Sequence, residues 1–440
     1  MSFEVLTIVL FASFFIMLAT GLPIAWVLGG VGMLFTVIIS GSSSFVQAAL
    51  CTWDTMMSFT LIAIPLFVLL GTVLQHSGLA EAIYHSMLLW AGRLPGGLAI
   101  GTIFICTLIA AMVGTIGAGI VVSSVMGLPE MRKRGYNDRM VIGAIMAGGT
   151  LGVLIPPSVG FLVYAACTGL SVGQLFAAGL FPGLLLSALY MLYIFIRCTI
   201  NPAMGPGLPP EERVNWKEKI ISLKDSILAI ALIFAVLGSI FVGIATPTEA
   251  AAVGCFMAVL ISAVYRKLNI KMLQGALYDA LRIFGMIFFL FAAATVFSRF
   301  YMGMGLKMYL EGIITDLALG PWVVLAGMMV FMFFAGMIIH DIAIVLVCAP
   351  LFSMIMVDFG FDPLWFAMVF IVNLQIAIIS PPFGPALFYM RGCVDEKVGF
   401  RGVALSAFPY MGIQIVGLTL IILFPQISLW LPRLIFARFY

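Results

Sequence analysis

The sequence predicts an all-α polytopic membrane protein built from two inverted-topology repeats, each with about five crossings and one re-entrant helical hairpin. The first observation is composition: 63% of the 440 residues are hydrophobic and only 9% are charged, whereas soluble domains carry roughly 25% charged residues. The second is that apolar stretches of about 20 residues, each long enough to cross a hydrocarbon layer of about 30 Å, recur along the chain. The third is a set of Pro and Gly residues that recurs at a nearly constant spacing.

The composition and the missing motifs exclude several classes of function. The seven Cys are scattered without a CxxC pattern and the three His make no ligand pair, so we expect neither a disulfide framework nor a metal centre. A net charge of +3 does not suggest a nucleic-acid partner. No Gly is followed by Lys, which removes the GxxxxGK[ST] phosphate loop of ATPases. Any uphill transport must therefore draw on an ion gradient.

The repeat is visible in residues that punctuate helices. Pro23, in Gly-Leu-Pro, matches Pro247, in Ala-Thr-Pro, 224 residues further on. Ile-Pro-Pro-Ser at 155–158 matches Ser-Pro-Pro-Phe at 380–383, 225 residues further on. Because Gly and Pro are frequent in membrane helices, a chance alignment is the alternative, but the offsets stay ordered along the chain. The chain is therefore divided into a first repeat (1–196), a linker (197–225), a second repeat (226–432) and a tail (433–440).

Loop charges give the two repeats opposite orientations. The segment 129–139 carries four Lys or Arg residues, whereas its counterpart at 351–363 carries only Asp358 and Asp362. Cytoplasmic loops collect Lys and Arg, so the first segment is expected in the cytoplasm and the second in the periplasm. The number of crossings is consistent with these loop orientations if each half has one re-entrant hairpin, at 98–128 and at 321–350. Both termini are then expected in the periplasm and the linker in the cytoplasm. Arg433 and Arg438 run against this scheme.

Two matching connectors precede the hairpins. Residues 76–97 and 299–320 mix charged with apolar side chains, for example Glu81 and Arg93 in the first and Lys307 in the second. They are interpreted either as amphipathic helices that lie in the membrane interface or as ordinary surface loops. Two inverted copies are typical of secondary transporters, whose binding site lies near the midplane between the halves.

Four interrupted helices are expected at membrane depth, at 114–119, 148–158, 336–341 and 375–385. Unpaired backbone groups are costly in hydrocarbon, so such breaks must line protein or a polar cavity. Pro removes an N–H and leaves carbonyl groups unpaired, and oxygen ligands suit hard cations. The N-terminal ends of interrupted helices favour a carboxylate or sulfonate. We therefore expect one cation site per half, although a Pro-Pro kink that serves packing alone is the alternative.

Few polar side chains fall within the apolar segments. Asp341 is the one acid inside the second hairpin, and with His340 it is a candidate to bind an ion or a proton unless the hairpin tip is simply hydrated. Glu249 is expected to cap a helix. The amides of Asn373, Gln375 and Gln414 are expected to make hydrogen bonds between helices rather than to bind ligands.

At these residues the chain resembles the large membrane subunit of tripartite ATP-independent periplasmic (TRAP) transporters over essentially its whole length. The segments that carry the resemblance are Gly21-Leu-Pro-Ile-Ala, Met131-Arg-Lys-Arg-Gly-Tyr, Gly149-Thr-Leu-Gly-Val-Leu-Ile-Pro-Pro-Ser, Gly243-Ile-Ala-Thr-Pro-Thr-Glu-Ala-Ala-Ala-Val-Gly and Ser380-Pro-Pro-Phe-Gly. The resemblance implies Na⁺-coupled import of organic acids across a bacterial or archaeal inner membrane, by an elevator-like motion of a hairpin-bearing domain. It also implies two partners, a small four-helix membrane subunit and a periplasmic substrate-binding protein.

The resemblance also assigns site residues. It implies about two Na⁺ sites, formed mostly by main-chain carbonyls of Thr115, Gly152, Ile155 and Pro157 in the first half and Gly336, Ala377, Ser380 and Phe383 in the second. It points to substrate contacts at Gly114, Pro156, Ser158, His340, Asp341 and Pro381. Family members often have a Ser-rich first hairpin tip where this chain has Gly-Thr-Ile-Gly, and Gly and Thr where it has Ala377 and Ser380.

The function expected from the sequence is Na⁺-coupled import of a small organic anion, a carboxylate or sulfonate, delivered by a binding protein. The alternatives are a stand-alone symporter that needs no binding protein, a passive channel, and a membrane enzyme. An intramembrane hydrolase would need paired acids or a nucleophile with its base, and only the isolated Asp341 is found, so no enzymatic activity is expected. No side chain identifies the substrate.

Overall fold

The computed structural model describes residues 3–41, 43–90, 94–207, 215–222, 224 and 227–436. Its first half contains ten α-helices, which are α1 (Phe3–Ala19), α2 (Ile24–Ser40), α3 (Ser43–Met56), α4 (Phe59–His76), α5 (Leu79–Trp90), α6 (Gly97–Val113), α7 (Ile116–Lys133), α8 (Asp138–Thr150), α9 (Val159–Thr168) and α10 (Val172–Ile200). A short 3₁₀ turn, Leu151–Val153, follows α8. Helix α10 continues four residues beyond the expected end of the first repeat at 196.

Among its described residues the linker contains one short α-helix and the 3₁₀ turn Pro202–Met204, and the second half contains ten more α-helices. These are α11 (Trp216–Ser222), then α12 (Ile227–Phe241), α13 (Pro247–Val264), α14 (Ile270–Gly303), α15 (Leu306–Asp316), α16 (Pro321–Ile338), α17 (Asp341–Asp358), α18 (Pro363–Ile379), α19 (Pro385–Cys393), α20 (Gly399–Leu423) and α21 (Gln426–Ile435). Linker residues 208–214, 223 and 225 lie outside the described residues, as do Arg93 and the end of the tail at 437–440, with Arg438.

The helices are long and apolar enough for a multi-pass membrane protein. Among the described residues, six of them could each cross a membrane, and the bent pair α3 and α4 makes a seventh span if it counts as one. Six further apolar helices have 10–17 residues. The all-α polytopic fold is therefore confirmed, whereas the number of five crossings per half stays a prediction.

The helix ends follow local capping chemistry. The hydroxyl of Thr246 accepts a hydrogen bond from the backbone N–H of Glu249 (3.3 Å), and the Glu249 carboxylate accepts one from the backbone N–H of Thr246 (2.8 Å). This reciprocal pair starts α13 with Pro247 in its first turn. The expected capping role of Glu249 is confirmed. Asn137 and Asn269 cap α8 and α14 in the same way, each accepting from the N–H three residues on.

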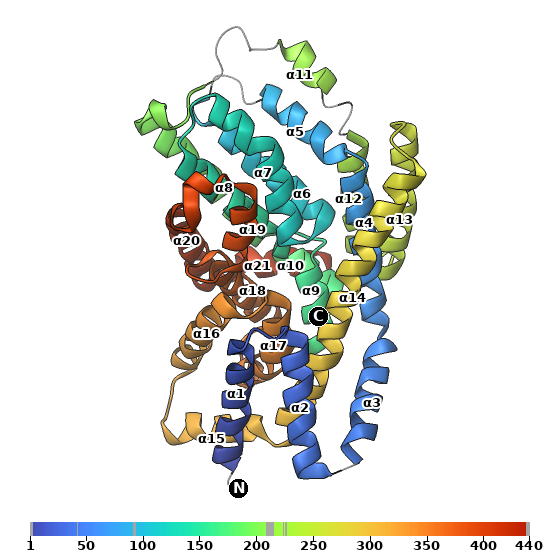
Figure 1. Cartoon of the computed structure of the whole chain (residues 1–440), viewed down its shortest axis with the longest axis vertical. Helices are drawn as coiled ribbons and strands as arrows, with labels where there is room; N and C mark the ends of the chain where they lie inside the picture. The colour runs from blue at the N-terminus through green and yellow to red at the C-terminus, as the bar shows by residue number, and fades with distance from the viewer. Residues whose placement is uncertain are drawn as a thin grey trace.

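Four helices form a group that we call the frame: α2, α4, α13 and α14. The 34-residue α14 packs along α2 and α4, and α13 packs against α4. The approach of α2 to α14 is close, because a Cβ on Gly32 would lie 2.9 Å from the Cα of Phe297. In Figure 1 α4, α13 and α14 lie toward the right side together with α3 and α12, and α2 lies lower and nearer the middle. Helices α7, α8 and α9 of the first half pack against α19, α20 and α17 of the second half, respectively, so the two halves interlock.

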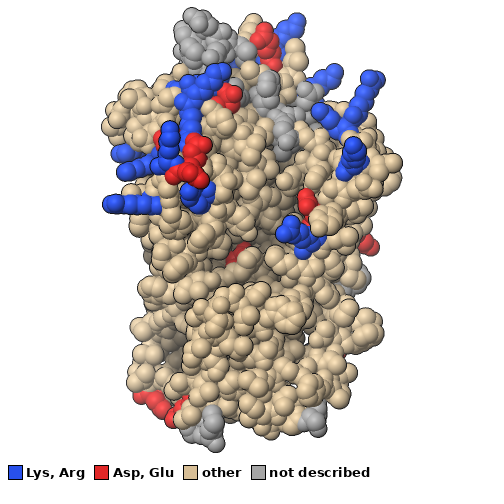
Figure 2. Space-filling model, viewed as in Figure 1, with Lys and Arg blue, Asp and Glu red and all other residues tan. Residues whose placement is uncertain are grey.

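The distribution of charge orients the molecule in the membrane. Figure 2 shows Lys and Arg gathered over the upper part of the molecule, whereas the lower end of the same face carries acidic residues. The upper end holds α5 and α11, and the lower end holds the N-terminus and α15 (Figure 1). The concentration of Lys and Arg favours the cytoplasm for the upper end, in agreement with the orientation expected from the loops. Arg433, which is an exception to the charge rule, lies 3.5 Å from Asp362, an acid in a segment expected on the periplasmic side.

Both connectors contain helices. Residues 79–90 form α5, and residues 306–316 form α15, at opposite ends of the molecule in Figure 1. On α15, Lys307 contacts Asp358 at 2.7 Å and Glu311 at 3.4 Å, and these acids raise the pKa of the Lys307 ammonium group. The connectors therefore contain helices, and the Lys307–Asp358 ion pair joins α15 to the end of α17.

Candidate functional site

The first expected hairpin, 98–128, is a helix, a two-residue break and a second helix. Helix α6 ends at Gly114, whose φ of +64° is a conformation that Gly adopts without strain, and the Gly114 N–H donates to the Ala110 carbonyl (2.9 Å). Thr115 is extended, and α7 starts at Ile116. The break is narrower than the expected 114–119, because Gly119 lies inside α7 and serves packing: a Cβ on it would be 3.2 Å from the Cα of Gly149.

The second expected hairpin, 321–350, has the same build. Helix α16 continues to Ile338, Ile339 is extended, and α17 starts at Asp341. Gly336, expected in the break, is helical, and a Cβ on it would lie 2.6 Å from the Cβ of Ala377 in α18. The break is therefore confined to Ile339 and His340, and Gly336 allows close packing of α16 on α18.

The two Pro-Pro segments each interrupt a helix. In the first half, α8 ends at Thr150 and α9 starts at Val159, and residues 151–158 between them are fully buried. In the second half, α18 ends at Ile379 and α19 starts at Pro385. Both Pro-Pro peptide bonds are cis. The expected interruptions are confirmed at both places, although Gly148 and Gly149 belong to α8 and Gln375 to α18.

The first hairpin break lies directly on the first Pro-Pro segment. A Cβ on Gly114 would be 2.6 Å from the Pro157 carbonyl oxygen, and one on Gly152 would be 3.0 Å from the Thr115 carbonyl oxygen. The structure therefore brings together three of the four residues assigned to the first cation site, with Ile155 in the same segment. No hydrogen bond outside the helices reaches the carbonyls of Gly152, Ile155 or Pro157 within the described residues. These carbonyls can accept a further ligand.

The four residues assigned to the second cation site differ in their surroundings. Gly336 and Ala377 touch, and Ser380 follows one turn later and is buried. The Ala377 carbonyl accepts from the Ser380 N–H (3.1 Å), and the Ser380 carbonyl accepts from the Gly384 N–H (2.9 Å). Phe383 is 57% exposed. Each hydrogen-bonded carbonyl keeps one lone pair, so this segment offers fewer uncommitted oxygen atoms than the first.

The residues expected at the substrate fall into two groups. Gly114, Pro156 and Ser158 belong to the buried first segment, where the Ser158 hydroxyl donates to the Val153 carbonyl at 2.6 Å. That hydroxyl is fully buried and committed, so it is not available to a substrate in this conformation. His340 and Pro381 belong to the second half and are partly exposed, as is Asp341 to a smaller extent.

His340 and Asp341 form a close pair at the start of α17. The Nδ1 atom of His340 lies 2.6 Å from the Oδ1 atom of Asp341, and their side chains are 34% and 13% exposed. Tyr389 on α19 lies within electrostatic range of Asp341. A Cβ on Gly117, in the first hairpin, would lie 3.0 Å from the Tyr389 ring. Tyr389 thus stands between the two hairpins, a position that no feature of the sequence indicated.

The oxygen atoms at these breaks are almost all peptide oxygens. Across the described part of the chain, no three His, Cys, Asp or Glu side chains gather in a group that could hold a metal ion. Peptide oxygens are ligands that suit a hard cation.

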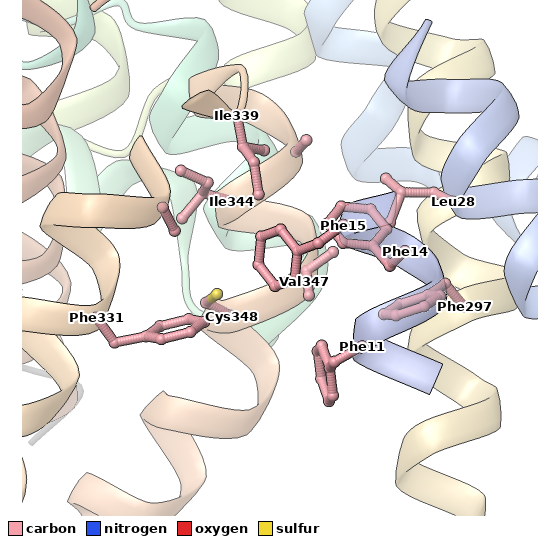
Figure 3. A pocket seen from close by; sticks show the side chains of 12 residues that line it. Phe11, Phe14, Phe15, Leu28, Phe297, Phe331, Ile339, Ile344, Val347 and Cys348 are labelled. Atoms are coloured by element: carbon pink, nitrogen blue, oxygen red, sulfur yellow. The ribbon is translucent and has the colours of Figure 1, made fainter. Parts of the chain in front are cut away.

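An apolar pocket lies between the second hairpin on one side and α1, α2 and α14 on the other. Figure 3 shows Phe11, Phe14 and Phe15 of α1, with Leu28 of α2 and Phe297 of α14, facing Phe331, Ile339, Ile344, Val347 and Cys348 of the second hairpin. Two polar contacts cross beside this pocket from α14 to α17: the Ser298 hydroxyl donates to the Leu346 carbonyl (3.2 Å), and the Tyr301 hydroxyl donates to the Val347 carbonyl. The hairpin is thus held to the frame by dispersion contacts and few hydrogen bonds.

Paired interruptions of apolar helices in a multi-pass protein are typical of membrane transport proteins. The fold resembles a solved transporter, Alcanivorax borkumensis YdaH, with a TM-score of 0.63, 16% identity and coverage of 89% of each chain. Residues 11–427 match the family described as the tripartite ATP-independent periplasmic transporter, DctM component. The chain belongs to this family, the large permeases of TRAP transporters, so the resemblance noted in the sequence is confirmed, as is a place in the inner membrane.

Curated relatives of the chain are named for different substrates. The C4-dicarboxylate TRAP transporter large permease protein DctM of Pseudomonas aeruginosa is 32% identical over 92% of this chain and 93% of its own length. The ectoine TRAP transporter large permease protein TeaC of Halomonas elongata is 29% identical over 86% of this chain and 87% of its own length. These relatives are transport permeases and not enzymes.

Proposed function

We propose that this chain is the large membrane subunit of a Na⁺-coupled importer of small organic anions. The observation that carries the proposal is the contact between the first hairpin break and the first Pro-Pro segment: the Pro157 carbonyl oxygen lies beside Gly114, and Gly152 lies beside Thr115. Among the described residues, the carbonyls of Gly152 and Pro157 accept no hydrogen bond outside the helices. Buried peptide oxygens without partners are costly, and a bound cation would satisfy several at once. The similarity to a C4-dicarboxylate permease supports an anionic substrate.

Sodium coupling is energetically adequate for such a substrate. Each Na⁺ that enters down 100 mV releases about 2.3 kcal/mol, and a tenfold concentration ratio adds about 1.4 kcal/mol. Two ions therefore supply roughly 7 kcal/mol. A monoanion that moves inward against the same voltage costs about 2.3 kcal/mol, which leaves roughly 5 kcal/mol and a gradient of a few thousandfold. A dianion costs twice as much and is limited to roughly a hundredfold.

The orientation of the paired elements supports inverted repeats and an elevator-like motion. The connectors α5 and α15 precede the two hairpins and lie at opposite ends of the molecule (Figure 1), as inverted copies require. The second hairpin meets the frame across an apolar pocket (Figure 3). An interface with few directional bonds can slide with little loss, because dispersion contacts re-form after each step. In this proposal the hairpins and both Pro-Pro segments move against the frame.

Two protein partners complete the proposed transporter: a small four-helix membrane subunit and a periplasmic substrate-binding protein. The family supports both. The frame and the neighbouring α3 expose large apolar side chains, including Trp26, Trp53 and Phe256, which are 60–64% exposed. Such surfaces face lipid or another apolar helix in a membrane.

The experiment is uptake into proteoliposomes made with the complete transporter. Radiolabelled organic anions, beginning with a C4-dicarboxylate, are offered with a Na⁺ gradient, with a matched choline gradient, and with or without the binding protein. We expect uptake only with Na⁺ and the binding protein together. Uptake without Na⁺ would overturn the coupling, and uptake by this chain alone would favour a stand-alone symporter.

A further inference from the structure

A cluster of fully buried polar side chains lies where the two halves meet. Thr150 ends α8 in the first half, and Gln375 on α18 and Gln414 on α20 come from the second half. The Nε2 atoms of the two amides both point at the Thr150 hydroxyl oxygen, at 2.9 Å from Gln375 and 3.3 Å from Gln414. The Thr150 hydroxyl itself donates to the Ala147 carbonyl (2.7 Å). None of the three side chains is accessible to solvent.

Thr150 and Gln375 occupy the same position in the two repeats. They are 225 residues apart, the same spacing that separates the two Pro-Pro segments. A direct bond between two equivalent positions can form only near the axis that relates the repeats. Thr150 lies two residues before Gly152, and Gln375 lies two residues before Ala377. The hydrogen bond therefore joins corresponding points just ahead of the two candidate cation sites.

The cluster is incompletely paired. The Oε1 atoms of Gln375 and Gln414 have no hydrogen-bond partner among the described residues. Buried unpaired polar groups reduce stability, and apolar side chains of the same shape would avoid this loss. Such a cluster also has a second arrangement available, in which one amide group rotates by half a turn and its Oε1 atom accepts the Thr150 hydroxyl proton in place of the Ala147 carbonyl. The cluster can therefore act as an element with two states, and energetic coupling between two sites requires such an element.

We propose that the Thr150–Gln375 hydrogen bond, supported by Gln414, couples the two cation sites, so that Na⁺ at one break raises the affinity of the other. This inference rests on the proposed sodium coupling. A cation at the first break fixes the Gly152 carbonyl and so the last turn of α8, which sets the position of the Thr150 hydroxyl. That hydroxyl orients the Gln375 amide and the last turn of α18, which carries Ala377 and leads to Ser380. The coupling acts equally in the reverse direction.

The test is the Na⁺ dependence of uptake by the complete transporter in proteoliposomes. The variants are Thr150→Val and Gln375→Met, which keep side-chain volume and remove the hydrogen bond, and their double variant. Thr150→Ser keeps the hydroxyl. Asn373→Leu is the matched control, because this buried amide on the same helix donates to the Met329 carbonyl (3.0 Å) within the second half.

Loss of coupling has a defined signature. We expect a Hill coefficient of about 1.4–1.9 for the native chain and Thr150→Ser, the range that coupling factors of 5–150 give for two equal sites, and close to 1 for Thr150→Val, Gln375→Met and the double variant. For two equal sites the half-saturating Na⁺ concentration changes with the square root of the coupling factor, so typical factors of 5–150 predict a rise of about 2- to 12-fold. The double variant is expected to equal the single variants, because both remove the same bond. Asn373→Leu should keep the native Hill coefficient.

The outcomes separate this inference from the proposed function. Uptake without any Na⁺ dependence in the native chain would overturn both. Na⁺-dependent uptake with a Hill coefficient of 1 in the native chain, or a native coefficient retained in Thr150→Val and Gln375→Met, would overturn the coupling alone. If a variant reaches the membrane in too small an amount for uptake, Na⁺-dependent thermal stabilisation of the purified protein gives the same comparison, with the steepness of the Na⁺ dependence as its readout.

Discussion

Replacing Gly152 with Ala tests the first cation site most sharply. A Cβ at this position would lie 3.0 Å from the carbonyl oxygen, 3.2 Å from the carbonyl carbon and 3.3 Å from the backbone nitrogen of Thr115. All three are backbone atoms, so the hairpin break must shift by a few tenths of an ångström. Overpacking of this kind costs about 1–3 kcal/mol. Because the displaced carbonyl is an assigned ligand, the same loss applied to Na⁺ affinity weakens it roughly 5- to 150-fold.

The assay is initial uptake against Na⁺ concentration, with Gly30→Ala as the matched control. Gly30 is also helical, and a Cβ there would meet nothing within 4 Å. We expect Gly30→Ala to keep the native half-saturating Na⁺ concentration and Gly152→Ala to raise it roughly 5- to 150-fold. A larger side chain at Gly152 is expected to abolish Na⁺-stimulated uptake while the protein still inserts. Equal Na⁺ dependence in Gly152→Ala and Gly30→Ala would refute the reasoning.

Two further substitutions separate movement from stability. Tyr301→Phe removes the hydrogen bond from α14 to the Val347 carbonyl. Such a bond is worth about 0.5–1.5 kcal/mol, so if it breaks as the hairpin moves, its removal should raise the uptake rate roughly 2- to 12-fold. An unchanged initial rate of uptake would argue against movement at this contact. Thr246→Ala removes the cap of α13 and should lower the stability of the protein by about 1 kcal/mol. We expect a lower melting temperature and an unchanged Na⁺ dependence of uptake. An altered Na⁺ dependence would contradict a purely structural role for the cap.

Much of the architecture could be predicted because the membrane leaves few choices. Long apolar stretches must be helices, and Pro-Pro at 156–157 and 381–382 must interrupt them. The hairpin breaks were also located, but as six-residue segments. The structure narrows them to two residues each, because Gly119 and Gly336 serve helix packing and not chain reversal. A sequence does not distinguish these two uses of Gly.

The side-chain partners could be predicted only in kind. Asn373, Gln375 and Gln414 were expected to make hydrogen bonds between helices, and all three do. That two of them meet on Thr150 depends on how the halves interlock, which no local pattern encodes. The position of Tyr389 between the hairpins depends on the same packing. The Ser158 hydroxyl, expected at the substrate, is committed to the Val153 carbonyl, because a buried polar group takes the nearest acceptor.

In the proposed transporter, helices interrupted at equivalent positions hold Na⁺ with peptide oxygens. A high-resolution map of the complete transporter, recorded once in NaCl and once in choline chloride, tests this binding directly. We expect a Na⁺-dependent density peak among the carbonyls of Thr115, Gly152 and Pro157, and a second beside Ala377 and Ser380. Identical maps in both salts, with no peak at either break while uptake remains Na⁺-dependent, would contradict it.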